Sequence, residues 1–336
     1  MRQPEVARLL TLVLALVLAA PPVLSAGRLL VAAVTLTELL SPLRLPVLSM
    51  LTAEVQRDPW PLPGVAADRY QAPALRASVP LVLVHGFAPD GKDDPRLRPA
   101  AAVLARAGFD VVVPTIPGLT RGRLRPLDAE PVVKAISALA SARARPVAVV
   151  AISVGAGPAL LAAADPRVRD HVGIAVSIGG YASAAELLRF FLTGDYAWGP
   201  TRGHVDHDPQ IVAAFVEANA DLVDEPTHQA LARRDPARIS ALLAAPPPGL
   251  RSVLEALSPE RVAGDIRAPL ILVHGRGDRA VPYTESLRLA ATRPARTSVV
   301  LVGVMDHVEG PARFQVSQLR DLLALWLVVY QLSATS

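Results

Sequence analysis

"VAVVAISVGAGPALLAAADP", residues 147–166, places Ser153 between an apolar run and an alanine-rich run. The run before the serine is typical of a buried strand, and the run after it, with Pro158 in its first turn, is typical of a helix. A serine on such a tight turn lies above the carboxyl edge of a parallel sheet, where ligands of these sheets bind. The stretch therefore predicts an α/β fold and makes Ser153 a candidate nucleophile.

Short apolar runs alternate with helix-length segments over most of the chain, for example the helical pattern at residues 97–109. Because the apolar runs contain almost no polar residue, they fit parallel strands that are buried on both faces. The sequence predicts an α/β fold with a mostly parallel central sheet flanked by helices, in a domain at residues 69–330. Besides the strand before Ser153, strands are expected at residues 79–87, 110–118, 169–180, 268–278 and 297–307.

The alternation stops between residues 180 and 268, where the sequence carries several helical signals. An excursion of this length in a compact domain is more often a functional lid than a bare loop. We therefore expect a helical lid insertion at about residues 181–265. Its aromatic residues favour an apolar acyl or aryl substrate, or else they seat the lid on the core; they are Phe190, Phe191, Tyr196, Trp198 and Phe215.

The composition narrows the classes of function. With 51% hydrophobic and 19% charged residues, the chain is globular rather than disordered. The net charge of +4 comes from basic residues that are scattered and not interleaved with aromatics, which argues against nucleic-acid binding. The chain has no cysteine, which excludes disulfides, thiolate metal sites and a cysteine nucleophile.

The first fifty residues are strongly apolar. No charge interrupts residues 9–27, a basic leader precedes them, and Ser25 and Ala26 are small enough for signal-peptide cleavage. The apolar character continues over residues 29–40, which favours an uncleaved anchor or a helix lying on a membrane. Residues 1–50 are thus predicted to be a signal or anchor segment of a membrane-associated or exported protein. The alternative is a buried helix of a cytoplasmic domain.

From about residue 79 to 330 the chain resembles the α/β-hydrolase superfamily, and within it the serine esterases and lipases with an inserted lid. Two motifs carry the resemblance: A-x-S-x-G at residues 151–155 and G-x-x-D-x-x-V-P at residues 275–282. The resemblance implies a triad in the order serine, acid, histidine, with Ser153, Asp278 and His307 in these roles. The family pattern has glycine where this chain has alanine at position 151, and a single methyl is the least intrusive replacement.

Serine needs a base to take its proton and a carboxylate to orient that base. The resemblance also implies an oxyanion hole made by the N–H groups of Val154 and Phe87, with His85 bracing the turn. The expected function is hydrolysis of a small-molecule ester or related acyl bond through an acyl-enzyme, without cofactor or metal. Acyl transfer and peptide cleavage by the same triad remain open, as does a non-catalytic, membrane-associated binding module.

Two polar stretches are alternative sites. "GHVDHD", residues 203–208, carries four side chains of types that bind zinc: His204, Asp206, His207 and Asp208. They all lie in one short stretch, and the pattern offers no ligand from a distant part of the chain. "DGKDD", residues 90–94, follows the expected oxyanion turn. We interpret the first as a solvated loop of the lid and the second as a polar loop at the entrance.

Overall fold

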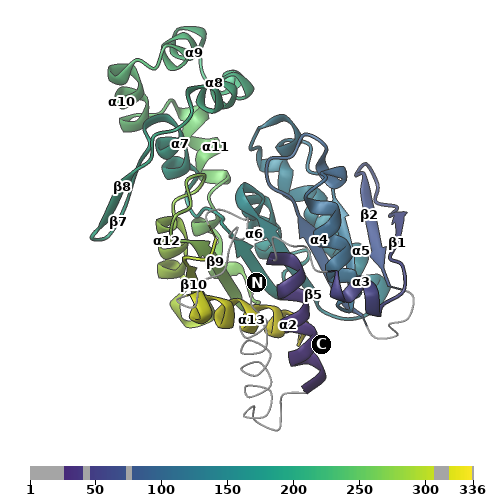
Figure 1. Cartoon of the computed structure of the whole chain (residues 1–336). Helices are drawn as coiled ribbons and strands as arrows, with labels where there is room; N and C mark the ends of the chain where they lie inside the picture. The colour runs from purple at the N-terminus through teal and green to yellow at the C-terminus, as the bar shows by residue number, and fades with distance from the viewer. Residues whose placement is uncertain (1–25, 41–45, 73–77, 306–317, 335–336) are drawn as a thin grey trace.

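The computed structural model describes residues 26–40, 46–72, 78–305 and 318–334. Its centre is an eight-stranded sheet with the strand order β1-β2-β4-β3-β5-β6-β9-β10 (Figure 1). The first two strands pair antiparallel with each other and β2 pairs antiparallel with β4, whereas all other neighbours are parallel. This arrangement confirms the predicted fold class. The strands are β1 (Gln56–Pro59), β2 (Ala67–Gln71), β3 (Val79–Val84), β4 (Phe109–Pro114), β5 (Val147–Ile152), β6 (Val172–Ile178), β9 (Leu270–Gly275) and β10 (Thr297–Val302).

Helices cover both faces of the sheet because alternate strand residues point to opposite sides. Val82 and Val84 belong to the apolar core shared with α5, α6 and α12. Leu81 and Leu83 belong to the core on the other face, shared with α4 and α13. Every residue of β3 and β4 is buried, as expected for strands inside a mostly parallel sheet. These helices are α4 (Leu97–Arg106), α5 (Glu130–Arg143), α6 (Ala156–Ala164), α12 (Thr284–Thr292) and α13 (Leu319–Ser333).

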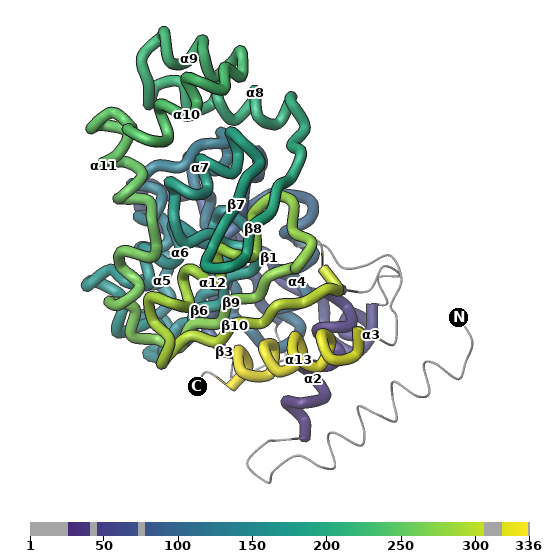
Figure 2. Tube along the Cα trace, turned by 90° about the vertical axis from the view of Figure 1, so that its left-hand side faces the viewer, coloured from purple at the N-terminus to yellow at the C-terminus, as the bar shows by residue number. Residues whose placement is uncertain are grey.

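A mostly helical insertion leaves the sheet after β6 and returns to it at β9, within the interval predicted for the lid. We call residues 184–256 the cap. Figures 1 and 2 show its outer helices standing away from the sheet at one end of the molecule. Its helices enclose an apolar cluster of their own that includes Leu192, Val212 and Leu242. The cap consists of α7 (Ala184–Thr193), the hairpin β7 (Asp195–Trp198) and β8 (Thr201–His204), α8 (Pro209–Ala218), α9 (Glu225–Ala232), α10 (Pro236–Ala244) and α11 (Pro248–Ala256).

The described part of the predicted N-terminal segment packs on the rest of the domain. Helices α2 (Ala26–Leu40) and α3 (Val47–Leu51) contact each other, and α2 lies against α13 (Figure 2). There the Trp326 indole N–H donates to the Leu29 carbonyl at 2.9 Å, and Leu29 is buried. None of the helices that the structure describes is both long enough and apolar enough to cross a membrane.

The sheet also includes residues that precede the expected start of the domain. Strand β1 and the first residues of β2 pair into the sheet before residue 69, the expected start. The sequence of β1, QRDP, has no apolar run, because this strand lies at the edge of the sheet and is mostly exposed. Periodicity therefore could not detect it.

Candidate active site

Ser153 lies on a sharp turn between β5 and α6, as the sequence predicts. Its φ is +55°, in the left-handed region that residues with a Cβ atom rarely adopt. Holding a residue there costs about 1–3 kcal/mol, and such strain is concentrated at functional sites. The combination of strand, strained serine and helix is the geometry of a nucleophile elbow.

The elbow touches the turn that follows β3. A Cβ atom added to Gly155 would lie 2.1 Å from the His85 carbonyl oxygen, and one added to Gly86 would lie 3.0 Å from the Ser153 Cβ. Only glycine permits this approach of two backbones. Phe87 and Val154, the two residues expected to supply oxyanion donors, therefore lie on turns that are in contact.

His85 fixes the shape of the turn after β3. Its Nδ1 lies 2.7 Å from the Gly86 carbonyl oxygen, and its Nε2 accepts the N–H of Ile116 at 3.0 Å. The proton is therefore on Nδ1, which donates to the carbonyl. Burial lowers the pKa of His85, which keeps the ring neutral in this tautomer. Both ring nitrogens are thus engaged by the backbone, which fits the expected bracing role.

Asp278 lies in the turn after β9, and its side chain is buried. Its Oδ1 accepts the backbone N–H groups of Ala280 and Val281 at 2.8 and 2.9 Å. Strand β6 alone separates β9 from β5, and the three strands are parallel. Asp278 and Ser153 therefore follow strands that end at the same edge of the sheet.

His274, near the end of β9, lies beside this carboxylate. The Nε2 of His274 is 3.3 Å from the Asp278 Oδ2 and 2.9 Å from the Val281 carbonyl oxygen, and its Nδ1 is 2.7 Å from the Ser286 hydroxyl. Both neighbours of Nε2 are acceptors, so Nε2 carries a proton and donates to them. No sequence pattern predicts this contact, because it depends on how the turn after β9 folds back.

We expect His274→Leu to lower kcat by about tenfold with little change in KM, because a buried carboxylate and a buried carbonyl lose their shared donor, a cost of about 1–3 kcal/mol. His274→Gln should recover part of kcat, since its amide also donates. Steady-state kinetics and thermal melts of both variants check this expectation. If glutamine and leucine lower kcat equally at equal stability, the hydrogen bond does not position Asp278.

The third predicted triad residue, His307, lies outside the described residues, as does its neighbour Asp306. Strand β10 runs parallel to β9 and ends beside it, with Val302 paired to Gly275 and accepting the Arg276 N–H at 2.7 Å. His307 therefore stays a prediction, and the structure brings together only Ser153, the Phe87 turn and the sheet edge that carries Asp278.

The side chains of "GHVDHD" have other partners. His204 lies between Asp195 and Asp206, whose carboxylates raise its pKa. His207 contacts the Phe190 carbonyl at 2.9 Å, and Asp208 caps α8. Within the part of the chain that the structure describes, no group of three or more histidine, aspartate or glutamate side chains could hold a metal ion.

The aromatic residues of the cap pack mainly on one another. Phe190 packs edge-on against Phe191 and Tyr196, and Phe191 stacks on Phe215 with centroids 4.7 Å apart. Trp198 lies under the Arg288 guanidinium. These contacts hold the cap together, Phe191 and Phe215 also pack in the core cluster that includes α5 and α6, and Phe215 lines a pocket.

Hydrogen bonds join the two chain segments that connect the cap to the core. The Tyr181 hydroxyl donates to the Leu257 carbonyl at 3.0 Å, and the Ala184 N–H donates to the Ser258 hydroxyl at 2.9 Å. The Tyr181 ring also fills the space beside Gly157, where an added Cβ would lie 2.1 Å from the phenol oxygen. Because Gly157 is in the first turn of α6, the base of the cap packs directly on the helix that follows Ser153.

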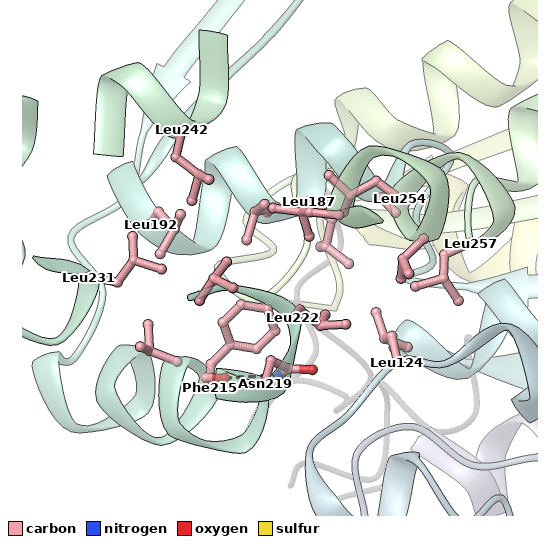
Figure 3. Close-up of a pocket in the computed structure, with 16 residues that line it drawn as sticks. Leu124, Leu187, Leu192, Phe215, Asn219, Leu222, Leu231, Leu242, Leu254 and Leu257 are labelled. Carbon is pink, nitrogen blue, oxygen red and sulfur yellow. Dashed lines mark hydrogen bonds between the residues drawn. The ribbon is translucent and has the colours of Figure 1, made fainter. Parts of the chain in front are cut away.

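An apolar pocket lies between the cap helices and the loop after β4 (Figure 3). In Figure 3, Leu231 and Leu242 lie at one end and Leu124 and Leu257 at the other, so the pocket is elongated. Its sixteen lining residues include one with a polar side chain, Asn219.

The polar atoms of Asn219 are already in use. Its amide donates to the carbonyls of Gly122 and Phe215 at 3.2 and 2.9 Å, and its oxygen accepts from Arg125 at 2.8 Å. Arg125 also pairs with Asp221. These contacts hold the cap against the loop after β4. Because they occupy the polar atoms of Asn219, the surface inside the pocket is apolar.

Comparison with known proteins places the fold in a family. The sequence matches the profile of the alpha/beta hydrolase family over residues 81–314. The chain belongs to this family. In this alpha/beta hydrolase, Ala151 stands where the motif has glycine, and its methyl is accommodated in the buried centre of the sheet, between Val84 and Ser177.

Solved structures of related fold include peptidases and esterases. A puromycin-hydrolyzing peptidase from Mycobacterium tuberculosis is 20% identical with a TM-score of 0.52, and an acylaminoacyl peptidase from Pyrococcus horikoshii is 15% identical with a TM-score of 0.54. The alignments cover 84% and 85% of this hydrolase but only 40% and 42% of the peptidase chains. A Pyrococcus furiosus esterase is 11% identical with a TM-score of 0.50, over 85% of this chain and 92% of the esterase. No curated protein matches the sequence.

Proposed function

We propose that this alpha/beta hydrolase is a serine hydrolase that cleaves an ester or related acyl bond. Ser153 attacks the acyl carbon, His307 takes the hydroxyl proton and passes it to the leaving group, and Asp278 orients the imidazole. The N–H groups of Val154 and Phe87 stabilise the oxyanion of the tetrahedral intermediate. Water then attacks the acyl-enzyme and releases the acid. The observation that carries the proposal is the strained Ser153 elbow in contact with the turn after β3.

Ser153 and Phe87 do not line the cap pocket, but we propose that the acyl chain extends into it, and its apolar lining then supports an apolar acyl group over a peptide. A peptide brings amide groups that need hydrogen-bond partners when they leave water. The one polar side chain of the pocket, Asn219, already has its amide nitrogen and its oxygen engaged. Peptide cleavage and acyl transfer to an alcohol or thiol would use the same triad, and the similar peptidase structures make peptide cleavage the second candidate.

Esters of longer acyl chains are expected to be better substrates. Each methylene that enters the pocket should raise kcat/KM by up to about fourfold. In Leu188→Trp the added ring fills the pocket, so kcat/KM should no longer rise with acyl-chain length. Ile211→Trp is the control, because Ile211 is on the exposed side of α8, and its kcat/KM should rise with chain length as in the wild type. The measurement is the ratio of kcat/KM for p-nitrophenyl octanoate to that for the acetate, in all three proteins.

Three results would count against this proposal. If kcat/KM of the wild type were about equal for the octanoate and the acetate, the pocket would not be part of the substrate site. An equal drop in the ratio for both tryptophan variants would have the same meaning. Turnover of aminoacyl amides but not of esters would favour the peptidase.

We also propose that the protein is held at a membrane through its N-terminal segment. The support is the uncharged run at residues 9–27 and its apolar continuation. The full chain should therefore sediment with lipid vesicles.

A further inference from the structure

Glu285, in the first turn of α12, is a buried carboxylate that the proposed mechanism does not use. Its side chain is 2% exposed. Its Oε2 accepts the backbone N–H groups of Ala182 and Ser183 at 3.0 and 2.9 Å, and its Oε1 accepts the Arg288 Nε–H at 3.1 Å. Burying a charge is costly unless the charge is hydrogen-bonded and paired, and Glu285 has both kinds of partner. These partners indicate what the residue holds in place.

The two N–H groups belong to the chain segment that enters the cap. Ser183 directly precedes α7 and makes no capping hydrogen bond with its own side chain. The helix dipole favours a carboxylate at a helix N-terminus, so Glu285 stabilises the start of α7 from the core side. Four residues of α7 line the apolar pocket: Ala184, Leu187, Leu188 and Leu192. One wall of the pocket is therefore held by a residue of the core.

The same segment packs on the nucleophile elbow. A Cβ atom added to Gly180 would lie 2.3 Å from the Ala156 Cβ in α6 and 3.6 Å from the Ser153 carbonyl oxygen. Ser183 follows shortly after Gly180 in the chain, so one short segment runs from the elbow to the start of the pocket wall. The contacts with Glu285 thus determine how α7 lies relative to Ser153.

Arg288, one turn further along α12, holds the outer part of the cap. Its Nη2 donates to the Ala197 carbonyl at 3.2 Å, and its guanidinium lies over the Trp198 ring, 4.6 Å from the centroid. Both of these residues are in β7, which α12 contacts (Figure 1). The Glu186 carboxylate of α7 is 3.6 Å from the same Nη2. The ion pair of Glu285 with Arg288 therefore joins the two places where α12 holds the cap.

We propose that Glu285 is a positioning residue that, together with Arg288, sets the place of the pocket wall relative to Ser153 and thereby the preference for acyl-chain length. The inference rests on the proposed function, in which the pocket receives the acyl chain. An acetyl group is too short to extend into the pocket, so its turnover should depend little on α7. Loss of either residue should therefore impair the turnover of long-chain esters selectively.

The chain-length preference tests the effect on catalysis. In Glu285→Ala the two N–H groups and Arg288 lose their acceptor. Arg288→Met removes the contacts with the hairpin but keeps an aliphatic stem. In both variants the ratio of kcat/KM for p-nitrophenyl octanoate to that for the acetate should fall by about tenfold, the loss expected when about two methylenes leave the pocket.

Asp110→Ala is the matched control for these variants. Asp110 is also a buried carboxylate paired with an arginine, Arg69. It lies at the start of β4, whereas Ser153 follows the end of the parallel strand β5, so the two residues are at opposite edges of the sheet. The control should lower the melting temperature but leave the ratio unchanged.

A distance measurement tests the position of the cap without using activity. Because the chain has no cysteine, Ile211→Cys in α8 and Leu327→Cys in α13 can each carry one spin label, and both side chains are exposed. Figures 1 and 2 show these two helices at opposite ends of the molecule. Pulsed electron paramagnetic resonance of the doubly labelled, full-length protein should give one narrow distance distribution, also with Asp110→Ala. The distribution should broaden with Glu285→Ala and with Arg288→Met.

The outcomes separate this inference from the proposed function. An unchanged distance distribution in folded Glu285→Ala overturns the inference whatever the ratio, and Arg288→Met decides in the same way if Glu285→Ala does not fold. A broader distribution with an unchanged ratio also overturns it, as does an equal fall of the ratio in Asp110→Ala. If the wild type hydrolyses the octanoate and the acetate equally well, the proposed role of the pocket is wrong, and the distance distributions still decide whether Glu285 positions the cap.

Discussion

Replacing Ser153 with alanine is expected to lower kcat by about 10⁴-fold or more and to abolish labelling by a fluorophosphonate probe. Alanine keeps the Cβ atom, so the strained backbone and the contact with Gly86 can persist while only the nucleophilic oxygen is lost. Gel fluorescence measures the labelling, and hydrolysis of p-nitrophenyl acetate measures kcat. Circular dichroism and the melting temperature should match those of the wild type.

Ser177→Ala is the matched control for this variant. Ser177 is a buried serine on β6, paired in register with Ala151, so its replacement removes a hydroxyl from the neighbouring strand. The control should keep both labelling and turnover. Labelling that survives in Ser153→Ala but disappears in another serine variant would place the nucleophile elsewhere and would remove the basis of the proposed mechanism.

The sequence predicts the central sheet well because its buried strands are mostly apolar. The expected strand at residues 110–118 ends earlier, as β4 at Pro114, since the segment beyond turns away to carry the Ile116 N–H that bonds His85. Strand β1 escapes detection because an exposed edge strand needs no apolar residues. Local pattern thus identifies the interior of this sheet and not its margin.

The N-terminal helix shows a different limit. An apolar helix pattern does not specify whether lipid or protein will cover it, and the described part of the segment has a protein partner on one side. Only the fold brings Trp326 next to Leu29, almost the whole chain apart in sequence. The signal or anchor segment at residues 1–50 stays a prediction, and the structure adds that α2 packs on α13.

The candidate site also has some residues that the sequence reveals and others that only the fold reveals. Ser153 and Asp278 can be recognised from the sequence because each follows an apolar strand and lies within a short sequence motif. The contact of His274 with Asp278 depends on how the turn after β9 folds back, with Ser286 of α12 closing it from the other side. Motif spacing indicates which residues can react, whereas the groups that hold them in place come from packing.

Asp278 and Asp306 are the two carboxylates considered as partners of His307, and their asparagine variants should differ by orders of magnitude. Asp278→Asn is expected to lower kcat by about 10⁴-fold, because an amide no longer stabilises the required tautomer of the histidine. Asp306→Asn should lower it by less than about tenfold, a cost near 1.4 kcal/mol. This expectation comes from the sequence: adjacent residues at the end of a strand tend to point to opposite sides, so we expect Asp306 not to reach the ring of its neighbour.

Asp278→Asn keeps the hydrogen bonds of Asp278 to its turn but loses the one from His274, because the amide nitrogen that faces the His274 Nε2 cannot accept. The side-chain oxygen of asparagine can still accept the N–H groups of Ala280 and Val281, so the turn should keep its shape. Steady-state kinetics of both variants across pH, with thermal melts, separate a loss of catalysis from a loss of folding. The reverse ranking in two folded variants would assign the acid to Asp306. Asp278 would then be a buried carboxylate that serves only to close the turn after β9.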